Sequence, residues 1–231
     1  MVLSVIIGFC LGLSIPAVAS RFGKILPADP GHILLSLWHR PRFPKVIDVP
    51  RARELHQKWK KLVLFSLFWG GIMAGLFGAA EILLPPGIAP WAKVFMCLIG
   101  FSIPVDSKYC LLPDFFTIPL LFLGFGAGAI MPVLTPLDSF MGAVFGYLIS
   151  VIAVMILGLL GCARPSEIGS GDVKMMTGLG AWLGTTGLNF ALILSFFLFA
   201  IPATLHTQRQ GPYGPALGIA AIIAFFFVYM N

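Results

Sequence analysis

Two aspartates, each beside a long apolar run, are the residues of this sequence best suited to chemistry. Asp172 ends a Gly-x-Gly-Asp sequence and shortly precedes the uncharged run from Met175 to Pro202. Asp106 directly follows the apolar run 94–105. An acid at the end of a membrane-spanning helix is costly to keep there, which makes each aspartate a functional candidate.

Paired carboxylates have a defined chemistry. Two that lie close together cannot both ionise easily, so one keeps a proton while the other is charged. The charged group can take a proton from water, and the protonated group can polarise a peptide carbonyl. This is the chemistry of aspartic proteases, and it requires no metal or cofactor. We predict that Asp106 and Asp172 form such a pair at one membrane face.

Residues next to Asp172 are candidates for supporting the site. Gly169 and Gly171 allow a tight turn and a close approach to another backbone. Lys174 either pairs with an acid or a lipid phosphate, or is a helix-end lysine that extends toward water. Both alternatives stay open from the sequence.

Other acids have simpler explanations as well. Asp114 precedes an apolar run that begins at Phe115, and N-capping of that helix is its expected role. Glu167 is near the Gly-x-Gly-Asp sequence, either at the site or in a plain loop. The two central acids have an alternative too, in which Asp172 caps a helix that begins at Val173 and Asp106 is a loop residue.

No rival catalytic set is visible. The histidines lack partners at the spacing of a serine–histidine–acid set or a zinc motif, and no two cysteines form a C-x-x-C pair. We therefore predict no metal site. The four histidines are His32, His39, His56 and His206.

The composition is that of a membrane protein. Of 231 residues, 58% are hydrophobic and 10% are charged, whereas soluble domains carry roughly 25% charged residues. Several apolar runs reach the length of about 20 residues that a helix needs to cross a bilayer. The alternating pattern of a membrane β-barrel is absent. We predict an all-α, polytopic membrane helical bundle with seven or eight transmembrane helices, forming a single domain over residues 1–231.

The number of spans depends on the run that follows Asp172. Gly180, Gly184 and Gly187 are candidate breaks in this run, and we favour two spans there. Pro104 is predicted to end the third span just before Asp106. The other expected spans are Val2–Ala19, Leu62–Ala80, Trp91–Val105, Phe115–Val133, Phe140–Ala163 and Pro215–Tyr229.

Basic residues are concentrated in one early segment. Most of the 15 lysines and arginines fall between Arg21 and Lys61, and such a cluster marks a cytoplasmic loop that faces anionic lipid. We therefore predict a basic cytoplasmic loop over residues 20–61, a short interfacial helix at Arg51–Lys61, and an N-terminus outside. The cluster lacks interleaved aromatic residues, so no nucleic-acid partner is expected.

An ordered set of motifs resembles the prepilin peptidases, or type IV leader peptidases, of type IV pilus and type II secretion systems. The chain carries D-S-K-Y-C-L-L-P-D at 106–114, G-S-G-D-V-K at 169–174, L-G-A-W-L-G at 179–184 and P-Y-G-P at 212–215. By this resemblance, Asp106 and Asp172 match the two catalytic aspartates of the family.

The resemblance implies an endopeptidase in the bacterial inner membrane, with its active site facing the cytoplasm. Its substrates would be prepilins or pseudopilins, cut after a glycine at the end of a short basic leader. Asp114 and Glu167 are candidates for attracting that leader. Larger relatives also methylate the new N-terminus with S-adenosylmethionine, but the loop 20–61 lacks their two C-x-x-C pairs. The oligomeric state is left open.

Other classes of protein remain alternatives. Presenilin-type proteases share Gly-x-Gly-Asp but need a Tyr-Asp pair, and here Val105 precedes Asp106. A proton-coupled transporter would use acids near the middle of the bilayer, whereas both acids lie at span ends and no inverted repeat is visible. In a non-catalytic assembly factor, the acids would only cap helices.

Overall fold

The structure is a computed structural model that describes residues 1–22, 49–110, 112–159, 170–205 and 212–230. The chain divides into two compact units, Met1–Gly78 and Ala79–Asn231. Each unit is described by itself. Within the described ranges, all regular secondary structure is helical, which confirms the predicted all-α class.

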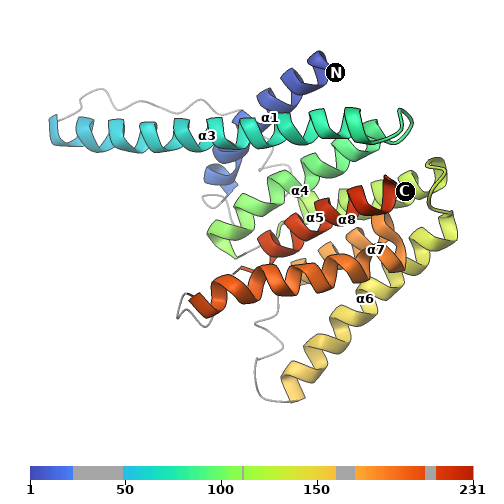
Figure 1. Ribbon diagram of the computed structural model, residues 1–231. Helices are drawn as coiled ribbons and strands as arrows, with labels where there is room; N and C mark the ends of the chain where they lie inside the picture. Colours follow the sequence, from blue (N-terminus) through green and yellow to red (C-terminus); the bar gives the residue numbers. More distant parts are fainter. Residues whose placement is uncertain (23–48, 111, 160–169, 206–211, 231) are drawn as a thin grey trace. The chain divides into compact units, whose positions relative to one another are not determined.

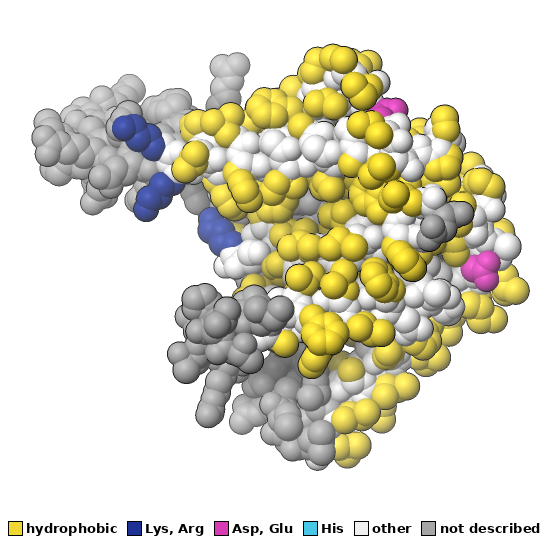
Figure 2. All heavy atoms as spheres, in the orientation of Figure 1, with side chains coloured by type: hydrophobic (Ala, Val, Ile, Leu, Met, Phe, Trp, Pro, Cys, Tyr) yellow, Lys and Arg dark blue, Asp and Glu magenta, His cyan; other side chains and the backbone are white. Residues whose placement is uncertain are grey.

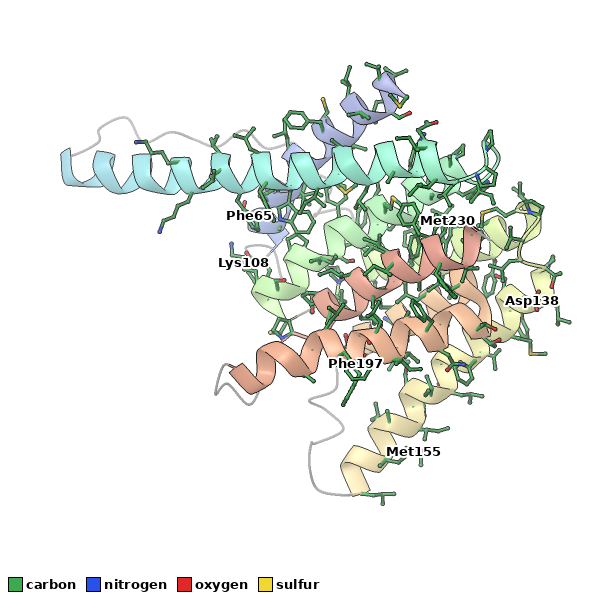
Figure 3. The ribbon with its side chains drawn as sticks, in the orientation of Figure 1. Phe65, Lys108, Asp138, Met155, Phe197 and Met230 are labelled. Atoms are coloured by element: carbon green, nitrogen blue, oxygen red, sulfur yellow. The ribbon has the colours of Figure 1, made fainter. Side chains whose placement is uncertain are left out.

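Seven helices are described, and five are long and apolar enough to cross a membrane. The shorter apolar helices are α5 and α8. Large hydrophobic side chains are exposed along α6, among them Leu148, Ile152 and Met155, as expected for contact with lipid (Figures 2 and 3). The bounds are α1 Val2–Phe22, α3 Val49–Leu83, α4 Ala89–Tyr109, α5 Asp114–Ile130, α6 Pro136–Leu159, α7 Ser170–Leu205 and α8 Gly214–Tyr229 (Figure 1).

In the first unit, glycines let α1 approach the backbone of α3. A side-chain carbon on Gly12 would lie 2.4 Å from the carbonyl oxygen of Trp69, and one on Gly8 would lie 2.7 Å from that of Met73. Small residues at such crossings are typical of membrane helices, because they allow backbones to pack closely.

The helix α3 corrects the expected layout of the basic segment. Residues Arg51–Lys61 do not form a separate interfacial helix, because α3 runs without a break from Val49 into the apolar span. The segment contains strong helix formers and neither glycine nor proline, so nothing in it ends a helix. The remainder of the predicted loop, residues 23–48, lies outside the described residues.

The helix α4 also runs further than predicted. Pro104 lies inside it, and the helix ends only at Tyr109. Membrane helices tolerate an internal proline, because neighbouring groups satisfy the carbonyl that proline leaves unpaired. The end is set by Cys110, which adopts the left-handed conformation (φ 49°) and donates its N–H to the carbonyl oxygen of Asp106 at 2.8 Å. Asp106 therefore lies in the last turn of α4.

The helix α7 folds back on itself at Gly184. This glycine has φ 65° and ψ −176°, a conformation that only glycine adopts readily. A side-chain carbon on Gly146 would touch both Met176 (2.4 Å) and Leu188 (3.1 Å). In a straight helix those two residues would be about 18 Å apart. The helix thus has two arms, 170–183 and 185–205, which confirms Gly184 as a break in this run.

Trp182, next to this break, is the centre of the second unit. It is fully buried. Its indole N–H donates to the carbonyl of Leu120 in α5 at 2.7 Å, and its own carbonyl accepts the hydroxyl of Tyr229 in α8 at 2.7 Å. Its ring also contacts Phe95 of α4, with ring centroids 5.2 Å apart. The side chain and carbonyl of this one residue therefore contact three other helices, α4, α5 and α8.

Candidate active site

Asp106 is a buried carboxylate where two helices meet. Its side chain is only 4% exposed. Oδ2 accepts a hydrogen bond of 3.0 Å from the backbone N–H of Gly214, the first residue of α8. The last turn of α4 and the first turn of α8 therefore converge on this carboxylate, and the positive end of the α8 dipole faces it.

Asp172 lies at the same end of the second unit. It is the third residue of α7 and is half-buried. Because α7 begins at Ser170, Asp172 does not cap a helix that begins at Val173. Asp172 lies close enough to Asp106 and to Tyr213 for the charge of each carboxylate to influence its neighbour. Lys108, two residues after Asp106, and Asp138 lie at opposite ends of this unit (Figure 3).

Gly171 brings two of the sequence motifs into contact. A side-chain carbon at this position would lie 2.8 Å from both the carbonyl oxygen and Cβ of Leu112. Leu112 belongs to the Leu-Leu-Pro-Asp segment that follows Asp106. A residue larger than glycine would push the start of α7 away from that segment, and would move Asp172 with it.

Lys174 and Asp114 form an ion pair beside the two acids. The ammonium group of Lys174 lies 2.6 Å from Oδ1 of Asp114, and both side chains are exposed. The predicted N-capping role of Asp114 is wrong, because Pro113 occupies the cap position and makes no side-chain capping bond. Asp114 lies one position inside the helix, where a negative charge in the first turn suits the helix dipole.

Two of the predicted supporting residues, Glu167 and Gly169, lie outside the described residues. Their role stays a prediction.

Tyr213 and Ser195 join the second arm of α7 to the start of α8. The hydroxyl of Ser195 donates to the carbonyl of Leu192 at 2.8 Å. That uses its single proton, so the Tyr213 hydroxyl must be the donor in the 2.5 Å contact between the two. Burial raises the pKa of Tyr213, and the charge of Asp172 raises it further. The phenol therefore stays protonated at neutral pH.

Neither Tyr213 nor Gly214 was predicted to have a role, although both belong to the Pro-Tyr-Gly-Pro motif. The signal that points to Gly214 is a glycine immediately before a proline at the start of an apolar helix. Its partner Asp106 is 108 positions away in the chain, so only the folded structure identifies what the glycine approaches.

The described residues hold no group of three or more histidine, cysteine, aspartate or glutamate side chains placed to bind a metal ion. They do place two carboxylates, Asp106 and Asp172, near the same end of the second unit. Such a pair can activate water and polarise a carbonyl group.

Comparison with known proteins agrees with this class of site. Residues 93–204 match the sequence profile of the Type IV leader peptidase family. The matched range includes both Asp106 and Asp172 and ends before Tyr213. This part of the chain is therefore similar to the type IV leader peptidase family, which confirms the resemblance noted in the sequence.

Curated relatives carry the name prepilin leader peptidase/N-methyltransferase. The protein from Pseudomonas aeruginosa is 35% identical over 141 residues, which is 58% of this chain and 46% of the relative. The protein from Dickeya chrysanthemi is 34% identical over 161 residues, which is 64% of this chain and 55% of the relative. The protein from Xanthomonas campestris pv. campestris is 29% identical over 143 residues, which is 59% of this chain and 49% of the relative. The chain thus spans about half the length of these relatives. No solved structure gave a significant match.

Proposed function

We propose that this chain is a membrane aspartyl endopeptidase that removes the basic leader of type IV prepilin-like precursors. Asp106 and Asp172 are its catalytic pair. One observation carries the proposal: Asp106 lies in the last turn of α4 and Asp172 in the first turn of α7, and these two acids, distant in the chain, are close enough for their charges to influence each other. The family match and the names of the relatives support the substrate class.

Each carboxylate has one task in the proposed reaction. The charged acid takes a proton from water, and the resulting hydroxide oxygen attacks the carbonyl carbon of the scissile peptide bond. The protonated acid donates its proton to the carbonyl oxygen. When the tetrahedral intermediate collapses, the C–N bond breaks and the leaving nitrogen takes up the proton held by the first acid. One hydroxyl proton of the intermediate returns to the second acid, which restores the starting state of the pair. The products are the leader, with a new carboxylate, and the mature N-terminus.

We place this reaction at the cytoplasmic face of the bacterial inner membrane, with the N-terminus of the chain outside. The concentration of lysine and arginine between Arg21 and Lys61 supports this orientation. A prepilin would lie with its apolar helix in the bilayer and its leader junction at the level of Asp106 and Asp172.

Attraction of the basic leader is assigned to acids near the pair. Asp114 is exposed and is paired with Lys174, so a basic leader would compete with Lys174 for its carboxylate. Glu167 is the second candidate. Reversing their charge, with Asp114→Lys or Glu167→Lys, is expected to raise KM for a basic leader and to leave KM unchanged for a leader without basic residues. Unchanged KM for both leaders would contradict this assignment.

The decisive experiment is cleavage of a synthetic prepilin by the purified chain in detergent. The substrate carries a basic leader, a Gly-Phe junction and an apolar helix. Asp106→Asn and Asp172→Asn are each expected to lower kcat at least about 100-fold, because each removes one half of the acid–base pair. Folding of each variant is checked by its thermal unfolding midpoint.

Asp138→Asn is the matched control. Asp138 accepts hydrogen bonds from Thr135 at the start of α6, in a reciprocal capping arrangement far from the pair. This variant is expected to cut at the wild-type rate. Equal cleavage by wild type and both other asparagine variants would reject the pair. No cleavage by any form would favour the transporter or assembly-factor alternatives, and proton flux would then be measured.

Methyl transfer is a second candidate activity, favoured by the names of the relatives. S-adenosylmethionine would supply the methyl group, and no residue of this chain is assigned to it. Incubating the cleaved product with labelled S-adenosylmethionine tests the activity by transfer of label to the new N-terminus.

A further inference from the structure

The carboxylate of Asp106 is fixed by a residue outside the region that matches the family profile. Gly214 donates its backbone N–H to Oδ2 of Asp106. The approach is so close that a side-chain carbon on Gly214 would lie 2.5 Å from Oδ2 and 2.9 Å from Cγ of the carboxylate. Even alanine at this position would displace the carboxylate or the start of α8.

The backbone that carries this N–H is itself anchored. Tyr213, the preceding residue, donates its hydroxyl to Ser195 on the second arm of α7. Its ring also packs edge-on against Phe199 of the same arm, with centroids 5.5 Å apart. Asp172 lies on the other arm of α7 and acts electrostatically on Tyr213. Gly214 therefore contacts Asp106, and Tyr213 lies within the electrostatic influence of Asp172.

We propose that Tyr213 and Gly214 are positioning residues for the catalytic pair. Tyr213 holds the start of α8 on the second arm of α7, and Gly214 then orients the Asp106 carboxylate toward Asp172. This inference rests on the proposed function of the two acids. Neither residue needs to touch the substrate, so their loss acts on the chemical step.

The first test compares two glycines of the same helix pair. Gly214→Ala places a methyl group against Asp106, and Gly218→Ala places one against Ile103 of α4, 2.8 Å from its Cγ1. Both disturb the packing of α8 on α4. Only Gly214→Ala is expected to lower kcat at least about 10-fold per folded molecule, with KM unchanged. It should also shift one limb of the pH–kcat/KM profile by about 0.5 to 1 pH unit, because a hydrogen bond to a carboxylate affects its ionisation.

The second test uses a milder change that keeps the backbone. Tyr213→Phe removes the hydroxyl that reaches Ser195, and Tyr229→Phe removes the one that reaches the Trp182 carbonyl at the other end of α8. Each variant loses one hydrogen bond, part-buried at Tyr213 and buried at Tyr229. Tyr213→Phe is expected to lower kcat and shift the pH profile, whereas Tyr229→Phe lowers the unfolding midpoint only. Ser195→Ala should reproduce Tyr213→Phe, and the double variant should be no worse than either.

The outcomes separate this inference from the proposed function. If Asp106→Asn is inactive while Gly214→Ala and Tyr213→Phe match their controls in kcat and pH profile, the positioning role is wrong and the catalytic pair stands. If Asp106→Asn cuts as fast as wild type, the proposed function itself fails. A shifted pH profile in Gly214→Ala and Tyr213→Phe, absent from both controls, supports the positioning role.

Discussion

Lys174 and Asp114 form an ion pair that joins the two motifs carrying the acids. Asp114 follows Asp106 by eight positions, and Lys174 follows Asp172 by two. The pair links the start of α5 to the start of α7, with 2.6 Å between Nζ and Oδ1. The charged residues that end the two motifs therefore meet each other in the folded chain.

Two sets of variants test the role of this pair: each charge is first neutralised alone, and the two charges are then reversed singly and together. Asp114→Asn and Lys174→Gln are each expected to lower the free energy of unfolding by less than about 1 kcal/mol, because the pair is exposed and screened by water. The double exchange Asp114→Lys with Lys174→Asp should recover much of the stability that either single reversal loses. A double variant as unstable as the sum of its single variants would show that the two charges do not interact.

Replacement of Gly184 should disrupt the reversal of α7. Gly184→Ala forces a side chain into a positive φ, which costs roughly 1 to 2 kcal/mol. Its methyl group would also lie 2.9 Å from Leu134. We expect a lower unfolding midpoint and lower cleavage, because the second arm carries Ser195.

Gly75→Ala is the control for this experiment. Gly75 lies within α3, and an added carbon there meets nothing within 4 Å. Because alanine is the better helix former by up to about 1 kcal/mol, the control should leave the unfolding midpoint unchanged or raise it. Equal losses in Gly184→Ala and Gly75→Ala would contradict a special role for the break.

The crossing of α6 and the first arm of α7 should be intolerant of any side chain. A carbon on Gly180 would lie 2.0 Å from the carbonyl oxygen of Gly142, and a carbon on Gly142 would lie 2.2 Å from that of Gly180. In both cases the added carbon would meet backbone atoms of the facing helix, which cannot move aside as a side chain can. Either alanine variant is expected to lose at least about 3 kcal/mol of stability. Gly126→Ala, whose carbon would be 3.9 Å from Trp91, should behave like wild type in the same thermal scan.

Replacement by phenylalanine should lower the stability of the protein by different amounts at two tryptophans, Trp182 and Trp69. Trp182→Phe leaves the buried carbonyl of Leu120 without its donor and is expected to cost about 1 to 3 kcal/mol. The indole N–H of Trp69 is buried and has no partner among the described residues. Trp69→Phe therefore removes an unsatisfied donor and should cost less. Unfolding midpoints measured side by side decide the comparison, and a larger loss for Trp69→Phe would contradict it.

The sequence by itself determined the helical membrane class, the positions of most spans and the two candidate acids. Long uncharged runs can satisfy their backbone in lipid only as helices, so hydropathy alone was sufficient. Gly184 was one of three glycines predicted as candidate breaks, because glycine is the residue that permits such a reversal, and the structure selects it among the three. Two predictions from local sequence signals were wrong. Pro104 does not end α4, and the charged segment Arg51–Lys61 is continuous with the apolar span of α3.

Only the tertiary structure decided which residues surround the acids. Asp114 has the spacing of a helix cap, yet its carboxylate meets Lys174, 60 positions later. Gly214 carries no polar side chain, and its importance comes from a backbone N–H that reaches Asp106 across 108 positions. Contacts between helices distant in the chain depend on how those helices pack, and no local pattern of residue types encodes that packing.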